Sequence, residues 1–247
     1  MFVRSKIINN SRVVLRPDNI FWRYAAELRQ KKARQYLKNF GIIELLQSQV
    51  STEIAPQFYD LYNLHQHICR FKPSICLEFG VGFSTIVIAH ALSVNGFGKV
   101  YTVDSNQYWL DNTLKKIPAN LAPYTELNFS EATIDIYNGS LCHFYTELPN
   151  IVPDFIYLDG PDANDVKNSF RGLRFGEMIG QKKERPSVAA DILLYESTLR
   201  ISTGFSMIVD GRSVNIDFLI RHLRRNYHVL VDRVLQYALF KLDYPFF

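Results

Sequence analysis

Cysteine is scarce in this sequence, and long apolar segments are missing from it. The three cysteines, Cys69, Cys76 and Cys142, are too few and too scattered for a disulfide framework or a zinc motif. No apolar run is long enough to span a membrane, and the first ten residues lack the apolar core and small-residue cleavage site of a signal peptide. The sequence therefore predicts a cytoplasmic protein with no membrane partner.

Charge of one sign is also limited. The chain of 247 residues has 28 lysines and arginines against 24 acidic residues, which gives a net charge of +4. No basic stripe interleaved with aromatic residues is present, so nucleic acid is not an expected partner. Hydrophobic residues make up 47% of the chain and aromatic residues 14%, which is enough for the core of an α/β domain with a small helical addition.

The most informative stretch combines a strand, a glycine turn and a helix. Ile75–Phe79 is a short apolar run typical of a buried strand. Gly80 and Gly82 follow, where the backbone can turn tightly and a ligand can approach without a Cβ in the way. The apolar run Ile86–Leu92 is typical of a helix. This order is that of the first unit of a nucleotide-binding α/β fold, with the ligand at the carboxyl end of the strand.

The residues around these glycines restrict the kind of nucleotide. A phosphate-cradling loop needs a lysine after its last glycine, and none follows here. The dinucleotide fingerprint needs a third glycine where this chain has Thr85. Glu78 precedes the loop, and a carboxylate there disfavours a pyrophosphate but suits a ligand that carries an ammonium or sulfonium group.

The pattern Glu78-x-Gly80-x-Gly82-x-Ser84 resembles the first motif of class I S-adenosylmethionine (SAM)-dependent methyltransferases. The usual motif is acid-x-Gly-x-Gly-x-Gly, so Ser84 stands where the last glycine is usual. The resemblance implies SAM as cofactor and methyl donor, with Glu78, Gly80, Gly82, Ser84 and Thr85 as candidate cofactor-binding residues. Ser84 or Thr85 is also expected to cap the following helix. A tight turn without a ligand is the alternative interpretation.

An acidic residue ends the next predicted strand, Lys99–Asp104. Asp104 lies roughly twenty residues beyond the glycine loop, where a carboxylate accepts hydrogen bonds from the ribose hydroxyls of an adenosine. Ser105 follows as a further cofactor-binding candidate and as the expected cap of a helix over Gln107–Ile117. Dehydrogenases share such an acid, so Asp104 indicates adenosine and does not choose the enzyme class.

Ala132–Tyr137 is predicted to be the third strand of the sheet. In the family that the motif resembles, the loop after the third strand flanks the adenine. Gly139 and Ser140 in this loop are therefore cofactor-binding candidates on the adenine side. A plain turn explains the same two residues equally well.

A second informative stretch follows the predicted strand Phe155–Leu158. The strand leads into Asp159-Gly160-Pro161-Asp162, which resembles the fourth-strand motif of the same family, where an acidic or polar group faces the methyl-transfer site. Asp159 and Asp162 are therefore the candidate catalytic residues, acting as a general base or binding a substrate cation. An exposed turn rich in Asp and Gly is the alternative.

The C-terminal part favours a methyltransferase over a dehydrogenase. A fifth strand over 205–210 and a helix over 215–226 precede two closely spaced strands at 228–231 and 234–242. Class I methyltransferases end with an antiparallel strand reached through such a hairpin, whereas dehydrogenases keep parallel order. The resemblance implies an α/β fold with a seven-stranded, mostly parallel Rossmann-like sheet, an antiparallel last strand and flanking helices.

Two further segments surround this predicted core. Residues 1–55 are expected to form an N-terminal helical cap, with a helix over 20–40, and residues 56–247 to form the SAM-binding domain. Residues 163–204 are long for a single crossover, so we expect a substrate-side insertion there. The N-terminal helices are candidates either to cap the site or to form a homodimer contact.

Three alternatives remain at this stage. A metal-dependent subgroup of the family uses an Asp after the fourth strand and an Asp-Asn pair after the fifth. Asp159 and Asp210 match, but Gly211 stands where Asn is expected, so we predict no metal site and keep magnesium as the weaker case. An NAD-linked Rossmann oxidoreductase and a non-catalytic SAM-fold binding protein are the other two. The predicted methyl acceptor is an unidentified small molecule or sugar.

Overall fold

The computed structural model describes residues 20–47, 58–172, 174, 190–198, 204–210, 213–232 and 237–242. The predicted domain boundary at residue 55 and the loop residue Gly211 lie outside these ranges, as do residues 175–189 of the predicted insertion. Among the helices of the described ranges, none has an apolar stretch that could cross a membrane.

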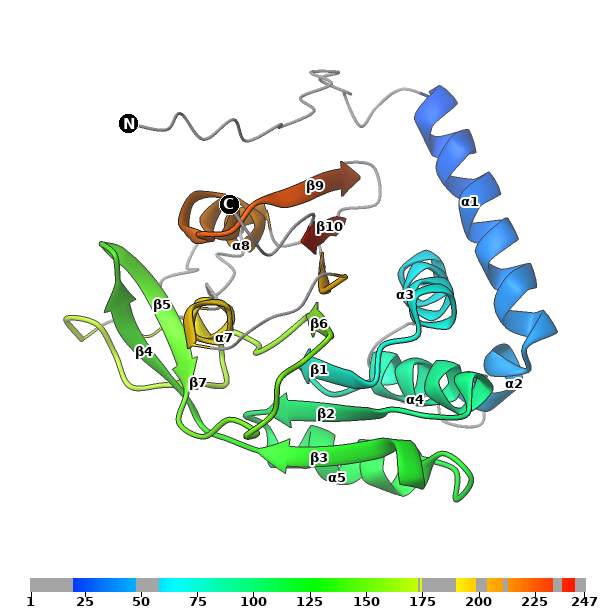
Figure 1. The fold of residues 1–247 in the computed structure, drawn as a ribbon, viewed down its shortest axis with the longest axis horizontal. Helices are drawn as coiled ribbons and strands as arrows, with labels where there is room; N and C mark the ends of the chain where they lie inside the picture. The colour runs from blue at the N-terminus through cyan, green and yellow to red at the C-terminus, as the bar shows by residue number, and fades with distance from the viewer. Residues whose placement is uncertain are drawn as a thin grey trace.

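Seven strands form the main sheet, in the order β3-β2-β1-β6-β8-β10-β9 (Figure 1). The strands from β3 to β8 are parallel, and β10 runs antiparallel to both of its neighbours, β8 and β9. The prediction of a mostly parallel sheet with an antiparallel last strand is therefore confirmed. The strand bounds are Ile75–Phe79 (β1), Lys99–Asp104 (β2), Thr125–Phe129 (β3), Phe155–Leu158 (β6), Ser206–Asp210 (β8), Tyr227–Asp232 (β9) and Tyr237–Leu242 (β10).

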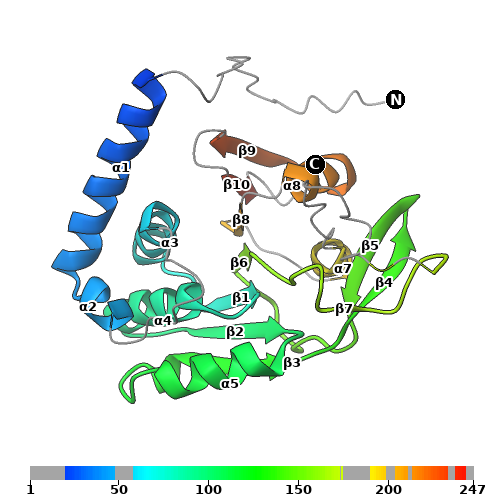
Figure 2. The same ribbon diagram turned by 180° about the vertical axis from the view of Figure 1, so that it is seen from behind.

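Helices cover both faces of this sheet. Buried side chains of α3 and α4 pack on one face, and those of α7 and α8 pack on the other. Helix α5 lies along the edge strand β3 (Figure 2). The helix bounds are Ile20–Asn39 (α1), Ile42–Gln47 (α2), Phe58–Phe71 (α3), Phe83–Asn95 (α4), Gln107–Lys116 (α5), Asp191–Thr198 (α7) and Ser213–His222 (α8), with a 3-10 turn at Ala122–Tyr124.

Strand β6 shows how the two faces are separated. Phe155 and Tyr157 join the core on the α3/α4 side, whereas Ile156 and Leu158 join the core on the α7/α8 side. Successive strand residues point to opposite faces, so a central strand that is covered on both sides is typically apolar on both faces, as all four residues of β6 are. This explains why the apolar run alone located β6 in the sequence.

A second, three-stranded sheet has the order β5-β4-β7, with β4 at Ala132–Tyr137, β5 at Ser140–Tyr145 and β7 at Val166–Lys167. The interpretation of Ala132–Tyr137 as the third strand of the main sheet is therefore wrong. That strand is Thr125–Phe129, which lies at the sheet edge and is half-buried, so it carries a weak apolar pattern. Ala132–Tyr137 has the stronger β-strand composition and pairs in a hairpin instead.

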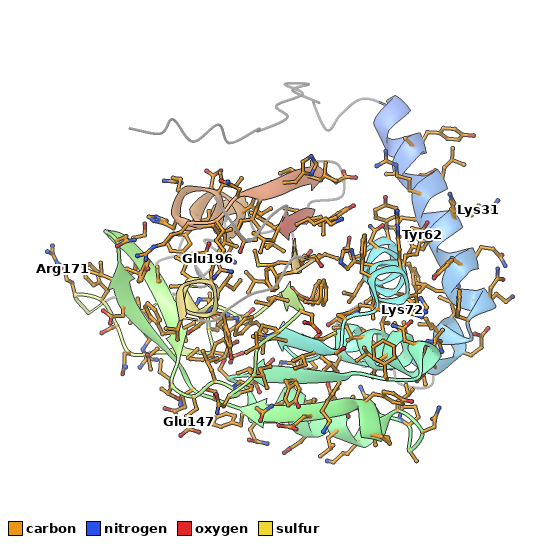
Figure 3. All side chains as sticks on the ribbon, viewed as in Figure 1. Lys31, Tyr62, Lys72, Glu147, Arg171 and Glu196 are labelled. Carbon is orange, nitrogen blue, oxygen red and sulfur yellow. The ribbon has the colours of Figure 1, made fainter. Side chains whose placement is uncertain are left out.

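The N-terminal helices α1 and α2 pack against α3 and the first turns of α4. Leu37 and Leu46 are buried there with Leu61 and Val87, each Leu contributing about 1.5–3 kcal/mol by its burial. Tyr62 of α3 points toward α1, while Lys31 of α1 points away from the body of the molecule (Figure 3). The predicted N-terminal helices are thus present and adjoin the carboxyl side of the sheet through α3.

Two polar contacts connect α1 to neighbouring elements. The Arg29 Nη1 atom lies 3.2 Å from the Asp232 Oδ2 atom at the end of β9. The Oε1 atom of Gln30 accepts a hydrogen bond of 3.1 Å from the backbone N–H of Tyr59. That N–H belongs to the first turn of α3, where backbone donors have no partner within the helix. Helix α1 therefore fixes the start of α3, which borders the site described next.

Candidate active site

Four strands of the main sheet end at the same level. The register pairs Phe79 with Val103 on one side and with Leu158 on the other, and pairs Leu158 with Val209. The residues that follow are therefore neighbours at the carboxyl edge of the sheet: Asp104, Gly80, Asp159 and Asp210. In a parallel α/β sheet this edge is where ligands bind.

The direction of these side chains follows from strand periodicity. Glu78, Thr102 and Tyr157 are register neighbours, and Tyr157 packs with α3 and α4. Residues two positions further along a strand point to the same face. Asp104 and Asp159 therefore face the α3/α4 side, where the glycine loop begins α4.

A cavity of about 420 Å³ lies at this edge. Six of the predicted site residues line it, namely Gly80, Gly82, Ser84, Asp104, Asp159 and Asp162. The predicted residues Glu78, Thr85, Ser105, Gly139 and Ser140 are absent from its lining. Lining residues that the sequence interpretation missed come from three helices, from β6 and from the loop after it: Asp60, Phe83, Trp109, Lys116, Tyr157 and Asp165.

Gly80 and Gly160 are in direct backbone contact. A Cβ atom on Gly80 would lie 2.9 Å from the Gly160 nitrogen, and one on Gly160 would lie 2.6 Å from the Gly80 Cα atom. Gly80 also has φ +97°, a conformation that side-chain-bearing residues rarely adopt. The Asp159 N–H donates to the Phe79 carbonyl at 2.9 Å and ties the two loops together. Both glycines are therefore required for the loops after β1 and β6 to meet.

Gly82 has a different task. Its φ of 171° is extended backbone, and a Cβ atom there would have no atom within 4 Å. Gly82 lines the cavity, so the missing side chain leaves open space for a ligand beside the backbone. Helix α4 begins at Phe83, and Gly82 is its N-cap residue. The prediction that Ser84 or Thr85 caps this helix is therefore wrong, because both lie inside its first turn.

Glu78 stabilises the glycine loop through hydrogen bonds on the side of the loop that faces the protein core. Its side chain is fully buried, and its Oε2 atom accepts hydrogen bonds from the Thr85 hydroxyl at 2.6 Å and from the Thr102 hydroxyl at 2.7 Å. The Thr85 Oγ1 atom in turn accepts from the Gly82 N–H at 3.1 Å. Burial raises the pKa of Glu78 to about 7, although these hydroxyl groups oppose the shift. Glu78 and Thr85 thus hold the loop together from a position outside the cavity lining, and the predicted attraction of Glu78 for a cationic ligand stays a prediction.

Asp104 is positioned by the backbone on both sides. Its Oδ2 atom accepts from the Val81 N–H of the glycine loop at 2.7 Å, and its Oδ1 atom accepts from the Asn106 N–H at 2.7 Å. The residue is 8% exposed, and burial raises its pKa while these N–H groups oppose the shift. Each carboxylate oxygen has a second lone pair, so Asp104 retains acceptor capacity toward the cavity.

The residues after Asp104 differ from the prediction. Asn106, and not Ser105, caps α5: its Oδ1 atom accepts from the Tyr108 N–H at 3.1 Å. The Asn106 Nδ2 atom donates to Asp165 at 3.1 Å. A second hollow of about 780 Å³ is lined by Ser105 and Asn106, and Asp165 belongs to both hollows. Asparagine just before a helical pattern is a strong cap signal, so Asn106 was recognisable from the sequence.

Gly139 and Ser140 lie away from the cavity. Asn138 and Gly139 have φ values of 47° and 77° and form the two-residue turn of the β4–β5 hairpin, as an Asn-Gly pair commonly does. The tip of the hairpin adjoins α8, where the Asn138 Nδ2 atom is 3.4 Å from the His222 Nδ1 atom. Both views show this hairpin on the opposite side of the molecule from α4 (Figures 1 and 2).

Aspartates dominate the other end of the cavity, near β6 and β8. Asp159, Asp162 and Asp210 reach it from the strand ends, and Asp60 reaches it from the first turn of α3. Burial, followed by the charges of Asp210 and Asp232, raises the pKa of Asp60 to about 7. Asp162 is exposed, and its Oδ1 atom accepts a hydrogen bond from the Asn164 N–H at 2.8 Å. One oxygen of this carboxylate therefore stabilises the turn in which Asp162 lies.

Asp159 and Asp210 are neighbours here, as the metal-dependent subgroup would require. Within the described residues, however, no group of three or more His, Cys, Asp or Glu side chains is arranged to hold a metal ion. The magnesium alternative therefore depends on whether Asp159 and Asp210 suffice as ligands.

Comparison with known proteins places this geometry in a structural class. No protein-family model matches the chain, and no curated protein matches its sequence. An O-methyltransferase from Bacillus cereus, solved in complex with SAH, has a TM-score of 0.50 at 16% identity over 87% of this chain and 99% of that one. A Klebsiella pneumoniae protein, provisionally identified as an O-methyltransferase, has a TM-score of 0.51 at 12% identity over 89% and 99%. The fold is that of class I SAM-dependent methyltransferases.

Proposed function

We propose that the protein is a SAM-dependent methyltransferase acting on a small-molecule acceptor. The observation that carries the proposal is the glycine loop at Gly80–Gly82, which packs on Gly160, binds Asp104 through the Val81 N–H and opens on a cavity of about 420 Å³. Cavities of about 300–1,000 Å³ are usual for small-molecule ligands. The fold shared with O-methyltransferases supports the same assignment.

The residues along the cavity suit SAM from one end to the other. Asp104 is assigned to the ribose hydroxyls, since its carboxylate is fixed and retains acceptor capacity. The backbone of Gly80, Gly82 and Ser84 is assigned to the methionine portion, where the open space beside Gly82 admits a ligand. The hollow lined by Ser105 is assigned to the adenine. Gly139 and Ser140 have no role in this assignment because they lie at a distant hairpin tip.

The chemistry follows from these positions. The bound cofactor supplies an electrophilic methyl group on a sulfonium. The chain orients the acceptor in line with that methyl group and limits water in the cavity. Asp159 adjoins the glycine loop, and we assign it as the general base that would take a proton from the acceptor as the bond to the methyl carbon forms and the methyl–sulfur bond breaks, with its electron pair kept by the sulfur. Asp162 is more exposed, and we assign it to acceptor binding at the cavity mouth.

The alternatives predict different ligands. An NAD-linked oxidoreductase would be expected to keep a parallel sheet, whereas β10 is antiparallel between β8 and β9. A non-catalytic SAM-fold protein would bind the cofactor without turnover. The antiparallel β10 supports the methyltransferase proposal over the first alternative, and an activity measurement separates it from the second.

Calorimetric titration tests the cofactor first. S-adenosylhomocysteine and NADH are titrated in parallel, with and without magnesium, into the parent protein and into Asp104→Ala. We expect one-site binding of S-adenosylhomocysteine that Asp104→Ala weakens about 100-fold, since charge-assisted hydrogen bonds contribute about 1.5–3 kcal/mol. Binding of NADH in place of S-adenosylhomocysteine would contradict the proposal. A magnesium requirement would revive a metal site at Asp159 and Asp210.

The flanking segments belong to the same proposal. We assign residues 1–55 as a helical cap on the domain spanning residues 56–247, supported by the packing of α1 and α2 on α3 and α4. We assign residues 163–204 as a substrate-side insertion, supported by the position of Asp165 in both hollows. Asp60 extends the acceptor end to α3, whose first turn α1 contacts through Gln30.

A further inference from the structure

The two ends of the cavity differ in charge. Asp104 shares its end with Lys116, which is the single basic side chain among the described residues that line the cavity. Asp60, Asp159 and Asp210 share the other end, and the described residues that line it supply no basic side chain. The cavity thus has one mixed end and one acidic end.

The sheet separates these ends. Asp104 ends β2 and Asp210 ends β8, with β1 and β6 between them. Three inter-strand spacings of about 4.8 Å give a separation of about 14 Å along the sheet edge. If Asp104 binds the ribose, Asp210 lies at the acceptor end. This step rests on the proposed function.

Tyr157 marks the acidic end independently of the aspartates. Its side chain is 4% exposed and lines the cavity beside the strand end that carries Asp159. Within the described part of the chain, the Tyr157 hydroxyl forms no hydrogen bond. A ligand that fills this end would lie against the Tyr157 side chain, whose hydroxyl can donate or accept a hydrogen bond.

From these observations we propose that the acceptor is an organic cation, an amine-bearing small molecule whose ammonium group binds between Asp60 and Asp210. The Tyr157 hydroxyl adds one more hydrogen-bond acceptor to this group. An ammonium relieves the mutual repulsion of these carboxylates, which a neutral or anionic ligand cannot do. The rings of Phe83 and Tyr157 line the same cavity, and aromatic faces also attract cations.

The ionisation behaviour at this end agrees with a cationic ligand. Burial, then the charges of Asp210 and Asp232, raises the pKa of Asp60 to about 7. Burial, then the charges of Asp159, Asp210 and Asp60, raises the pKa of Tyr157 well above its ordinary value. Negative charge is therefore unfavourable in this end of the cavity until a positive group enters.

An isosteric ligand series tests the proposal. Phenethylamine, 2-phenylethanol and 3-phenylpropionate share a ring and differ in the charge of the end group. Each is titrated calorimetrically at pH 8 into the protein, both alone and saturated with S-adenosylhomocysteine. We expect phenethylamine to bind at least about tenfold more tightly than 2-phenylethanol, and 3-phenylpropionate to bind more weakly still. Equal binding of the three, or no binding of phenethylamine, overturns the proposal.

Variants identify the residues involved. We expect Asp60→Asn and Asp210→Asn each to weaken phenethylamine about tenfold and to leave S-adenosylhomocysteine affinity unchanged. Asp217→Asn is the matched control, because it removes the same charge from an exposed position on α8, and we expect it to change neither affinity. If all three variants act alike, the amine is attracted by net charge and the assigned site is wrong.

The proposal can fail separately from the proposed function. If S-adenosylhomocysteine binds and phenethylamine shows no preference, the methyltransferase proposal stands and the cationic acceptor is wrong. If S-adenosylhomocysteine does not bind, the titrations of the unsaturated protein still decide whether the acidic end selects a cation. The same titrations with magnesium test whether this end binds a metal ion instead of an ammonium group. Tight magnesium binding that displaces phenethylamine, and that Asp210→Asn abolishes, would assign this end to a metal ion and overturn the proposal.

Discussion

The carboxylates at the two ends of the cavity are held in different ways. Both oxygens of Asp104 accept backbone N–H groups at 2.7 Å, so the chain itself fixes this side chain. Asp60 has no hydrogen bond within the described residues, and its pKa is raised by burial and then by the charges of Asp210 and Asp232. Backbone donors fix the carboxylate at one end, whereas burial, followed by neighbouring carboxylate charges, raises the pKa of the carboxyl group at the other.

Glu78 extends this comparison to a third environment. It is more deeply buried than Asp104 or Asp60, yet two threonine hydroxyls satisfy one of its oxygens and it reaches no ligand cavity. The same carboxyl group thus occurs beneath the loop with threonine donors, at the cavity with backbone donors, and at the cavity beside other carboxyl groups. The donors that surround each group decide which task it performs.

The largest expected effect tests the organised end through its glycines. Gly80→Ala is expected to lower the free energy of unfolding by about 3 kcal/mol or more and to abolish S-adenosylhomocysteine binding, because the Cβ atom would lie 2.9 Å from the Gly160 nitrogen at φ +97°. Urea unfolding measures the stability and calorimetry the binding.

Gly82→Ala is the matched control for that substitution. Its backbone is extended and its Cβ atom would enter open space, so we expect a stability change within about 0.5 kcal/mol together with weaker cofactor binding. Equal destabilisation by both substitutions would contradict the distinction between a packed and an open glycine.

The next effect concerns the fixed carboxylate. Asp104→Asn keeps the shape of the side chain but removes its charge and turns one acceptor into a donor facing a backbone N–H. We expect S-adenosylhomocysteine affinity to fall about 30-fold to 100-fold, equivalent to about 2–3 kcal/mol, with phenethylamine affinity unchanged. Calorimetry measures both. A loss of phenethylamine affinity as well would mean that the two ends are not independent.

The acidic end has a signature in the pH dependence of stability. With its pKa raised to about 7, Asp60 keeps a proton in the folded protein that the unfolded chain has released above about pH 4. The free energy of unfolding therefore declines through this group as the pH rises from about 4 to about 7. Asp60→Asn removes the effect, and we expect the variant to be more stable than the parent at pH 8 by about 1–2 kcal/mol, after allowance for solvent screening.

Urea unfolding at pH 5 and pH 8 measures this difference. Asp111→Asn is the control, since Asp111 is exposed on α5 and accepts a hydrogen bond from Gln107. The gap between Asp60→Asn and the parent should widen from pH 5 to pH 8, while the control should run parallel to the parent. A constant gap would show that Asp60 titrates normally. The ionisable groups that face Asp60 from other elements are Tyr157, Asp210, Asp232 and Tyr237.

The smallest expected effect on stability concerns the ion pair between Arg29 of α1 and Asp232 of β9. Arg29 pairs with Asp232 at 3.2 Å, but its side chain is 42% exposed, so the pair contributes little. Arg29→Ala is expected to change the free energy of unfolding by no more than about 0.5 kcal/mol. Urea unfolding beside Arg221→Ala, which removes an even more exposed pair, measures the difference. A loss above about 2 kcal/mol would mean that α1 depends on this ion pair.

Much of the fold was predictable because its signals are local. The predicted bounds of β1, β2 and β6 match the structure, because each is a short run rich in apolar and β-branched residues. The hairpin that brings β10 antiparallel into the sheet was also predicted. Strand β3 was missed because an edge strand is only half-buried and its pattern is weak.

In the candidate site, too, residues with a local sequence signal were predicted and residues without one were not. The strand-end residues Gly80, Asp104 and Asp159 were located by sequence, because strand ends follow directly from strand bounds. Asp60 and Tyr157 were missed, because a helix turn and a strand interior carry no local mark of facing a cavity. Their assigned roles remain predictions.

The sequence by itself determined the strands, the glycine turn and the acids at the strand ends, since these depend on side-chain periodicity and backbone freedom over a few residues. Only the tertiary structure decided that Glu78 lies beneath the loop, that the Gly139 turn lies far from the cavity and that Asp60 faces Asp210. These relations join segments distant along the chain, and they depend on packing geometry that no short stretch of sequence encodes.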